Sequence, residues 1–139
     1  MKLDANQARE LARSFRSVSV ALGDYRFAHW DALTKSQRDT IEGAEWTLLN
    51  YSSDFVTQAV GLTLDDAKSS LKNIQDAAAA AAAAVDAIQI VKKVIAVSGA
   101  VIKLGAAIVS ENPGFIASAT KDLFNAVTRS DDQTPTPSS

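Results

Sequence analysis

Acid–base or metal chemistry in this chain would depend on one histidine and one group of carboxylates. His29 is the only histidine and there is no cysteine, which excludes thiolate metal sites and paired-histidine mechanisms. Asp39, Glu42 and Glu45 follow one another at intervals of three and would share a helix face. A di-metal helical bundle would also need Glu-x-x-His motifs, which are missing. We interpret the carboxylates as a solvated acidic face and His29 as a structural or surface residue.

No recognised catalytic or phosphate-binding motif occurs in the sequence. GxGxxG, P-loop, HExxH and GxSxG patterns are all absent. The net charge is −2, with both signs interspersed, which argues against a nucleic-acid binder. Arg9, Arg13 and Arg16 lie opposite an apolar helix face and are interpreted as a solvated basic stripe. We therefore predict a non-enzymatic protein with no catalytic residues, no cofactor, no metal and no nucleic-acid partner.

The most unusual feature is the stretch from Ala77 to Ser110, which is nearly all apolar. Its charged residues are Asp86, Lys92, Lys93 and Lys103. A helix of this kind must bury most of its circumference in a protein core, an oligomer or a lipid surface. The function of the chain is therefore tied to what covers this stretch.

Two sets of residues in this stretch are candidate contact residues. Alanine favours helix, and its small side chain lets another helix approach closely. The predicted helix-packing residues are Ala77, Ala78, Ala81 and Ala84. The segment 94–109 would be about 24 Å long, shorter than the ~30 Å core of a bilayer. It also contains a lysine, so we expect it to lie on a lipid surface or a partner rather than to span a membrane. The predicted lipid or partner contacts are Val94, Ile95, Val101, Ile102, Leu104, Ile108 and Val109.

Helical periodicity covers nearly the whole chain. Apolar residues at intervals of three and four predict one helix up to His29. Thr34 and Gln37 form a capping-box pattern that opens a second helix. From Leu64 no stop signal occurs before Asn112, which predicts one helix of about 45 residues with bends near its glycines. Pro113 is well suited to the first turn of a last helix.

These elements predict an all-α fold, an antiparallel helical bundle or hairpin with one long, alanine-rich apolar helix. Residues 1–129 form a single helical domain, and residues 130–139 form a disordered polar tail. The two shorter helices fold back along the long one. We expect them to leave part of the apolar surface of 77–84 and 94–109 uncovered.

Two segments carry resemblances to known families. IEGAEWTLLNYSSDFVTQAV, followed by the alanine-rich stretch, is similar to phasins, helical proteins that coat storage-polyester granules. VIKLGAAIVSENPGFIASATKDL is similar to the apolar hairpins of helical pore-forming toxins. Both resemblances imply a non-enzymatic protein that acts on a lipid or polymer surface, and neither identifies a functional residue.

Two classes of function follow. The first is a self-associating helical protein, a homo-oligomer, that acts on a lipid or other apolar surface. The second is a soluble helical bundle that serves as a structural or adaptor protein for a protein partner. The start of the chain lacks the apolar run of a signal peptide. We expect a cytoplasmic protein without a cleaved signal peptide, peripheral to a membrane or granule if it binds one.

Overall fold

All the regular elements of the protein that the structure describes are helices. The computed structural model describes residues 5–58, 71–87, 90–110 and 113–128. The elements are α1 (Ala5–Ala28), the short 3-10 helix η1 (Trp30–Ala32), α2 (Lys35–Gln58), α3 (Leu71–Ala87), α4 (Val91–Val109) and α5 (Pro113–Thr128). The prediction of an all-α helical bundle is confirmed. The predicted tail, residues 130–139, lies outside the described residues, as does the expected start of the third helix.

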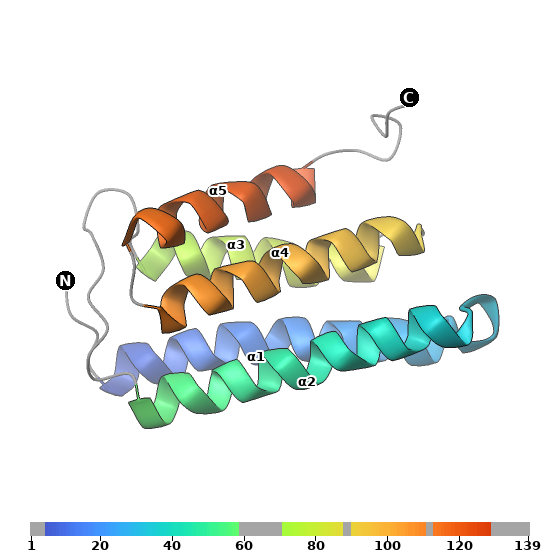
Figure 1. Cartoon of the computed structure of the whole chain (residues 1–139), viewed down its shortest axis with the longest axis horizontal. Coiled ribbons are helices and arrows are strands. Elements are labelled where there is room, and N and C mark those ends of the chain that lie inside the picture. Colours follow the sequence, from blue (N-terminus) through green and yellow to red (C-terminus); the bar gives the residue numbers. More distant parts are fainter. Residues whose placement is uncertain (1–4, 59–70, 88–89, 111–112, 129–139) are drawn as a thin grey trace.

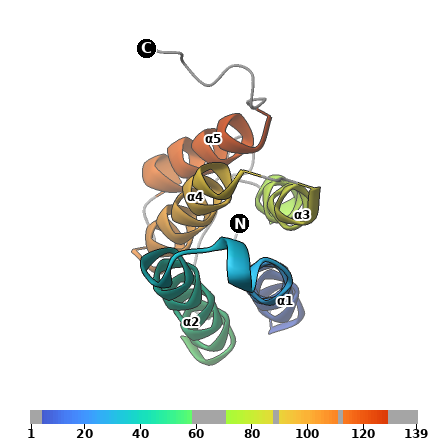
Figure 2. The ribbon, with the colours of Figure 1, turned by 90° about the vertical axis from the view of Figure 1, so that its right-hand side faces the viewer.

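The helices form a bundle in three layers, with consecutive helices running in opposite directions (Figure 1). α1 and α2 form the first layer (Figure 2). α3 lies over α1 and α4 lies over α2 in the second layer, and α5 packs on both of them as the third. The first layer therefore has one face turned towards the other helices and one face turned to solvent.

Short-range signals in the sequence define the α1–α2 hairpin. The backbone N–H of Gln37 donates to Thr34 Oγ1 at 3.1 Å, and the backbone N–H of Thr34 donates to Gln37 Oε1 at 2.9 Å. This reciprocal pair is the predicted capping box, and it satisfies amides that helix geometry leaves unpaired. Two hydroxyls then set the register between the helices. Ser19 donates to the Glu45 carbonyl and Ser52 to the Ala12 carbonyl, each at 2.9 Å.

The expectation of one continuous helix from residue 64 to 110 is not confirmed. The described part of this region forms two helices, and Ile90 between them has an extended backbone. The physical reason is the phase of the buried residues. Val94 lies nine residues after Val85, which is about two and a half helical turns. One straight helix would point these two buried side chains in opposite directions, whereas two antiparallel helices turn both towards one core.

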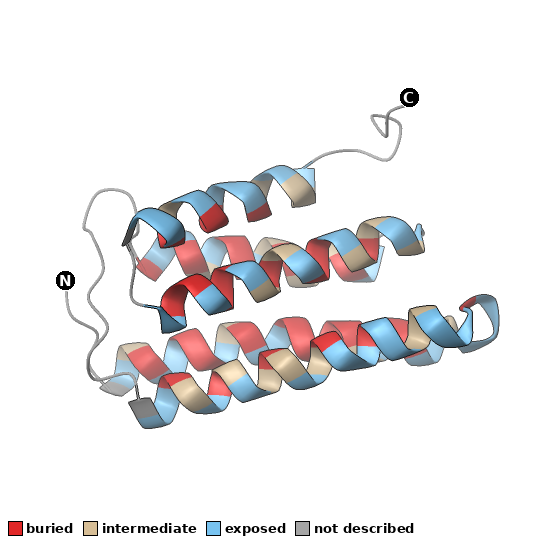
Figure 3. Ribbon diagram, in the orientation of Figure 1, coloured by how far each residue is buried: buried red, intermediate tan, exposed pale blue. Residues whose placement is uncertain are grey.

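The chain itself covers the apolar stretch. Residues at intervals of three and four along α3 and α4 are buried, on the sides that face the other helices (Figure 3). α5 adds Ile116, Ala119 and Leu123 to the same core. The expectation that two shorter helices would leave this surface uncovered is therefore wrong. Splitting the long helix lets its halves cover each other, and α5 and the first layer cover the rest.

Small residues allow the layers to approach closely. Ala77, Ala78 and Ala81 are completely buried, and Ala84 is partly buried against the core. Gly105 of α4 faces the ring of Tyr51 on α2. A Cβ atom at position 105 would lie 2.7 Å from Tyr51 Cε2. The close approach of α4 to α2 therefore depends on the absence of a side chain at position 105. Gly99, one of the glycines near which we expected the long helix to bend, lies within α4 with open space beside it.

Candidate interaction surface

The structure places most of the predicted lipid or partner contacts inside the bundle. Val94, Val101, Leu104 and Ile108 are buried, whereas Ile95 and Ile102 are partly buried and pack against the core. Val109 is the exposed member of this set. Contact with lipid through this segment stays a prediction, and it would require the bundle to open. Among the described residues, no helix combines the length and apolarity needed to cross a membrane.

The candidate acid–base residues do not come together in one site. His29 stacks on Tyr25 with 4.1 Å between ring centroids, and its Nδ1 lies 3.0 Å from the Tyr25 carbonyl oxygen. Asp39 forms an exposed ion pair with Lys35 on the same helix. Glu42 is exposed. Within the described part of the chain, no three metal-binding side chains are grouped.

The prediction of a solvated acidic face is wrong for Glu45, which is largely buried and paired with Arg26. Its carboxylate accepts two hydrogen bonds from the guanidinium of Arg26, at 2.6 Å from Nε and 3.1 Å from Nη2. The side chains retain only 10% and 14% of their full exposure, for arginine and glutamate respectively. Gly23 leaves room for the carboxylate, since a Cβ there would lie 3.0 Å from Glu45 Oε1. The hydrogen bond with Glu45 raises the pKa of Arg26, although burial acts in the opposite direction.

Aromatic rings and arginines form a stacked cluster at the tip of the hairpin. Phe27 and Trp30 stack with their centroids 5.9 Å apart. The Arg26 guanidinium lies 4.6 Å from the Phe27 centroid, and that of Arg38 lies 4.6 Å from the Trp30 centroid. Arg38 also donates to the carbonyls of Trp30 and Leu33, which ties the 3-10 turn to α2. The two rings and the two guanidinium groups therefore stack on one another at the tip, where Phe27 and Trp30 stay exposed.

Tyr25, beneath the tip, makes folding stability sensitive to alkaline pH. Burial raises the pKa of its phenol above the ordinary value of 10.0. Above about pH 10 the unfolded chain loses this proton first, so the contribution of Tyr25 to stability is complete below that pH and is lost as pH rises. We expect wild-type protein to lose more stability than Tyr25→Phe between about pH 8 and pH 11, measured by urea unfolding. Equal losses would contradict this.

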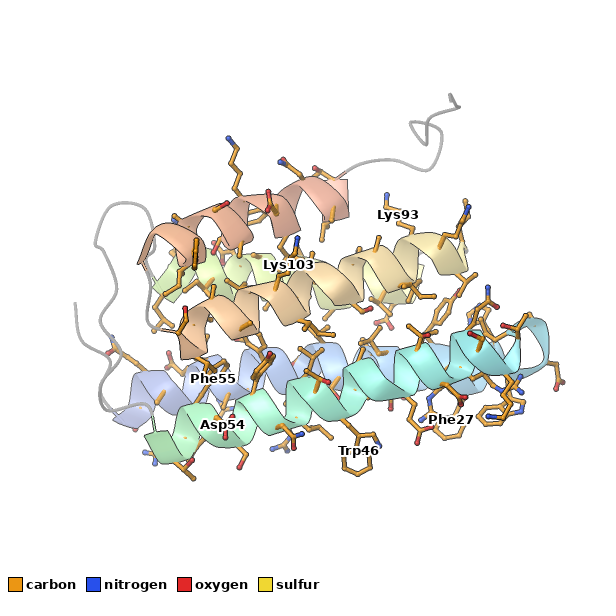
Figure 4. All side chains as sticks on the ribbon, viewed as in Figure 1. Phe27, Trp46, Asp54, Phe55, Lys93 and Lys103 are labelled. Carbon is orange, nitrogen blue, oxygen red and sulfur yellow. The ribbon has the colours of Figure 1, made fainter. Side chains whose placement is uncertain are left out.

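Large apolar side chains are exposed on the solvent face of the first layer, which we call the outer face. Phe27 and Trp46 project from it, away from the other helices (Figure 4), and retain 67% and 61% of their full exposure. Val20 and Val56 are also exposed. On helical geometry Val20 shares the side of Phe27 on α1, and Val56 lies where α2 meets α1. These residues define an apolar band over the two longest helices.

Charged residues on the same face are arranged along α1 with one sign at each end. Arg9, Arg13 and Arg16 line a shallow hollow that runs along α1 and is also lined by α2 and by Asp86 of α3, and Asp24 lines it further along. Arg9 donates to the Asn6 side chain at 2.8 Å. Arg13, Arg16 and Asp24 have no ion pair with any other described residue. The outer face therefore combines exposed apolar side chains with unpaired charges of both signs.

The sequence contains a signal for this surface that the helical periodicity alone does not reveal. The apolar stripe of α2 runs through Ile41, Leu48 and Phe55, and Trp46 lies off that stripe. Phe27 is likewise off the stripe of α1. Large aromatic residues on the polar side of an amphipathic helix indicate an exposed contact surface. The basic stripe was predicted, but not its combination with these rings.

Comparisons of the chain with protein families, with curated proteins and with solved structures give no match.

Proposed function

We propose that this protein is a non-enzymatic helical protein that self-associates through the outer face of α1 and α2. The observation that carries the proposal is the band of Val20, Phe27, Trp46 and Val56 on one solvent face. Single exposed apolar residues are ordinary on protein surfaces. Several of them on one face, with aromatic residues and arginines prominent, match the composition of protein interfaces.

Light scattering coupled to gel filtration tests this proposal. We expect wild-type protein to have a mass above its 14.7 kDa monomer, and the variant Phe27→Ser/Trp46→Ser to shift towards the monomer, because aromatic anchors contribute much of the energy of an interface. Phe115→Ser is the matched control, since Phe115 on α5 is 63% exposed but lies on a different layer. A monomer at every concentration would overturn the proposal.

A second candidate function is contact with a lipid surface through the same face. It is supported by tryptophan and phenylalanine beside arginines, a combination found where proteins meet the boundary between water and lipid. Both tryptophans, Trp30 and Trp46, belong to this region and are exposed. Their emission therefore reports directly on whether the face enters an apolar phase.

Vesicle flotation with tryptophan fluorescence separates the two routes to lipid. Binding through the outer face gives flotation and a blue shift in emission, and both are lost in Phe27→Ser/Trp46→Ser. Binding through the predicted segment 94–109 requires α4 to leave the core and does not use Phe27 or Trp46, so flotation would persist in Phe27→Ser/Trp46→Ser. If the protein floats neither with vesicles of neutral lipid nor with vesicles rich in anionic lipid, the lipid function is wrong.

A further inference from the structure

We infer that the occupant of the outer face is a second copy of this chain, placed antiparallel about a two-fold axis that passes near Trp46. This inference deepens the proposed function and rests on it. The first support is the order of residues along α1. Arg9 and Phe27 are eighteen residues apart, which is five turns at about 3.6 residues per turn, so they lie on one side of the helix.

A second α1 running the opposite way matches this order. If the axis passes level with residue 18, Arg9 lies opposite Phe27 of the second copy, and Arg13 lies opposite Asp24 of the second copy. Each contact then occurs twice, as a two-fold interface requires. One contact joins a guanidinium to an aromatic ring and the other joins opposite charges. Arg13 and Asp24, which have no ion pair within one chain, thus find partners in a second copy.

The register between α1 and α2 independently brings the same axis to Trp46. The hydrogen bond from Ser19 to the Glu45 carbonyl places Glu45 level with Ser19. Trp46 is therefore about level with residue 18 of α1, at the proposed axis. Its indole, which projects from the outer face (Figure 4), would contact the indole of the second copy. Two aromatic side chains at the centre, with charges further out, is the usual arrangement of a stable interface.

The size of the face is adequate for a dimer. α1 and α2 have 24 residues each, which is a length of about 36 Å. Two neighbouring helices are about 20 Å wide, giving roughly 700 Å² per copy, close to the ~800 Å² of a standard interface. Charge favours a second copy over an anionic lipid surface, because the exposed acids Asp24 and Glu42 lie on the same two helices as Phe27 and Trp46.

Charge reversal tests the pairing of Arg13 with Asp24. Arg13→Asp and Asp24→Arg each bring like charges together, and each should weaken dimerisation by at least about tenfold. An equal mixture of the two variants should restore the dimer mass in light scattering, because the mixed dimer has both opposite-charge pairs. The double variant Arg13→Asp/Asp24→Arg should also dimerise. The controls Lys121→Asp and Asp122→Arg make the same charge changes on exposed positions of α5, and they should have no effect.

Cysteine cross-linking tests the position of the axis, since the chain has no cysteine of its own. Trp46→Cys should form a disulfide-linked dimer under mild oxidation. Val56→Cys should not, because it lies about 15 Å from the axis and so about 30 Å from its own copy. A wild-type oligomer that ignores charge reversal and cross-links equally at both positions overturns this geometry but leaves self-association standing. A monomer overturns both, whether or not it floats with vesicles.

Discussion

Replacing Glu45 with alanine is expected to cost about 3 kcal/mol of folding stability, the lower end of the range for breaking a buried ion pair. The guanidinium of Arg26 would stay inside the hairpin without its carboxylate, and its two hydrogen bonds to Glu45 would be lost. Stacking on Phe27 would remain but does not neutralise the charge. Urea unfolding followed by circular dichroism measures the loss.

Two further variants separate the ion pair from general damage to α2. Asp39→Ala removes a carboxylate from an exposed pair on the same helix and should change stability by less than about 0.5 kcal/mol. Arg26→Met/Glu45→Leu removes both charges and should be markedly more stable than Glu45→Ala, because no unpaired charge is left buried. If Glu45→Ala and Asp39→Ala lower the free energy of unfolding by the same amount, the ion pair between Arg26 and Glu45 does not stabilise the hairpin.

Gly105→Ala is expected to destabilise the protein although alanine is the better helix former. The new methyl group would meet the Tyr51 ring inside van der Waals distance, and overpacking of this kind typically costs about 1–3 kcal/mol. The gain in helix propensity, about 0.5–1 kcal/mol, offsets only part of this. We expect a net loss of about 1–2 kcal/mol in urea unfolding, as α4 and α2 move apart.

Gly99→Ala is the matched control on the same helix. Position 99 is exposed with nothing within 4 Å, so the substitution should stabilise by about 0.5–1 kcal/mol. In a Tyr51→Leu background, which removes the ring, Gly105→Ala should lose most of its harmful effect. Equal effects of alanine at the two glycines would show that the close approach of α4 to α2 does not matter for stability.

The start of a helix could be predicted from the sequence where a residue near that start suits the unpaired backbone groups there. The capping pair Thr34 and Gln37 predicted the start of α2, and its hydrogen bonds are present. Pro113 opens α5 as predicted, because proline has no amide to leave unpaired there. The break between α3 and α4 has no such local signal. When nearly every residue is apolar, the side that becomes buried cannot be identified from periodicity.

The sequence by itself determined that this is an all-α protein with an apolar stretch that needs covering, since spacing and composition act locally. The tertiary structure decided what covers it, because burial depends on which helices meet. Folding the stretch into α3 and α4 turned Val94 and Leu104 inwards, whereas Trp46 and Phe27 are among the apolar residues of the first layer that stay exposed. The packing of α1 against α2 paired Glu45 with Arg26, two residues whose separation along the chain gives no indication of contact.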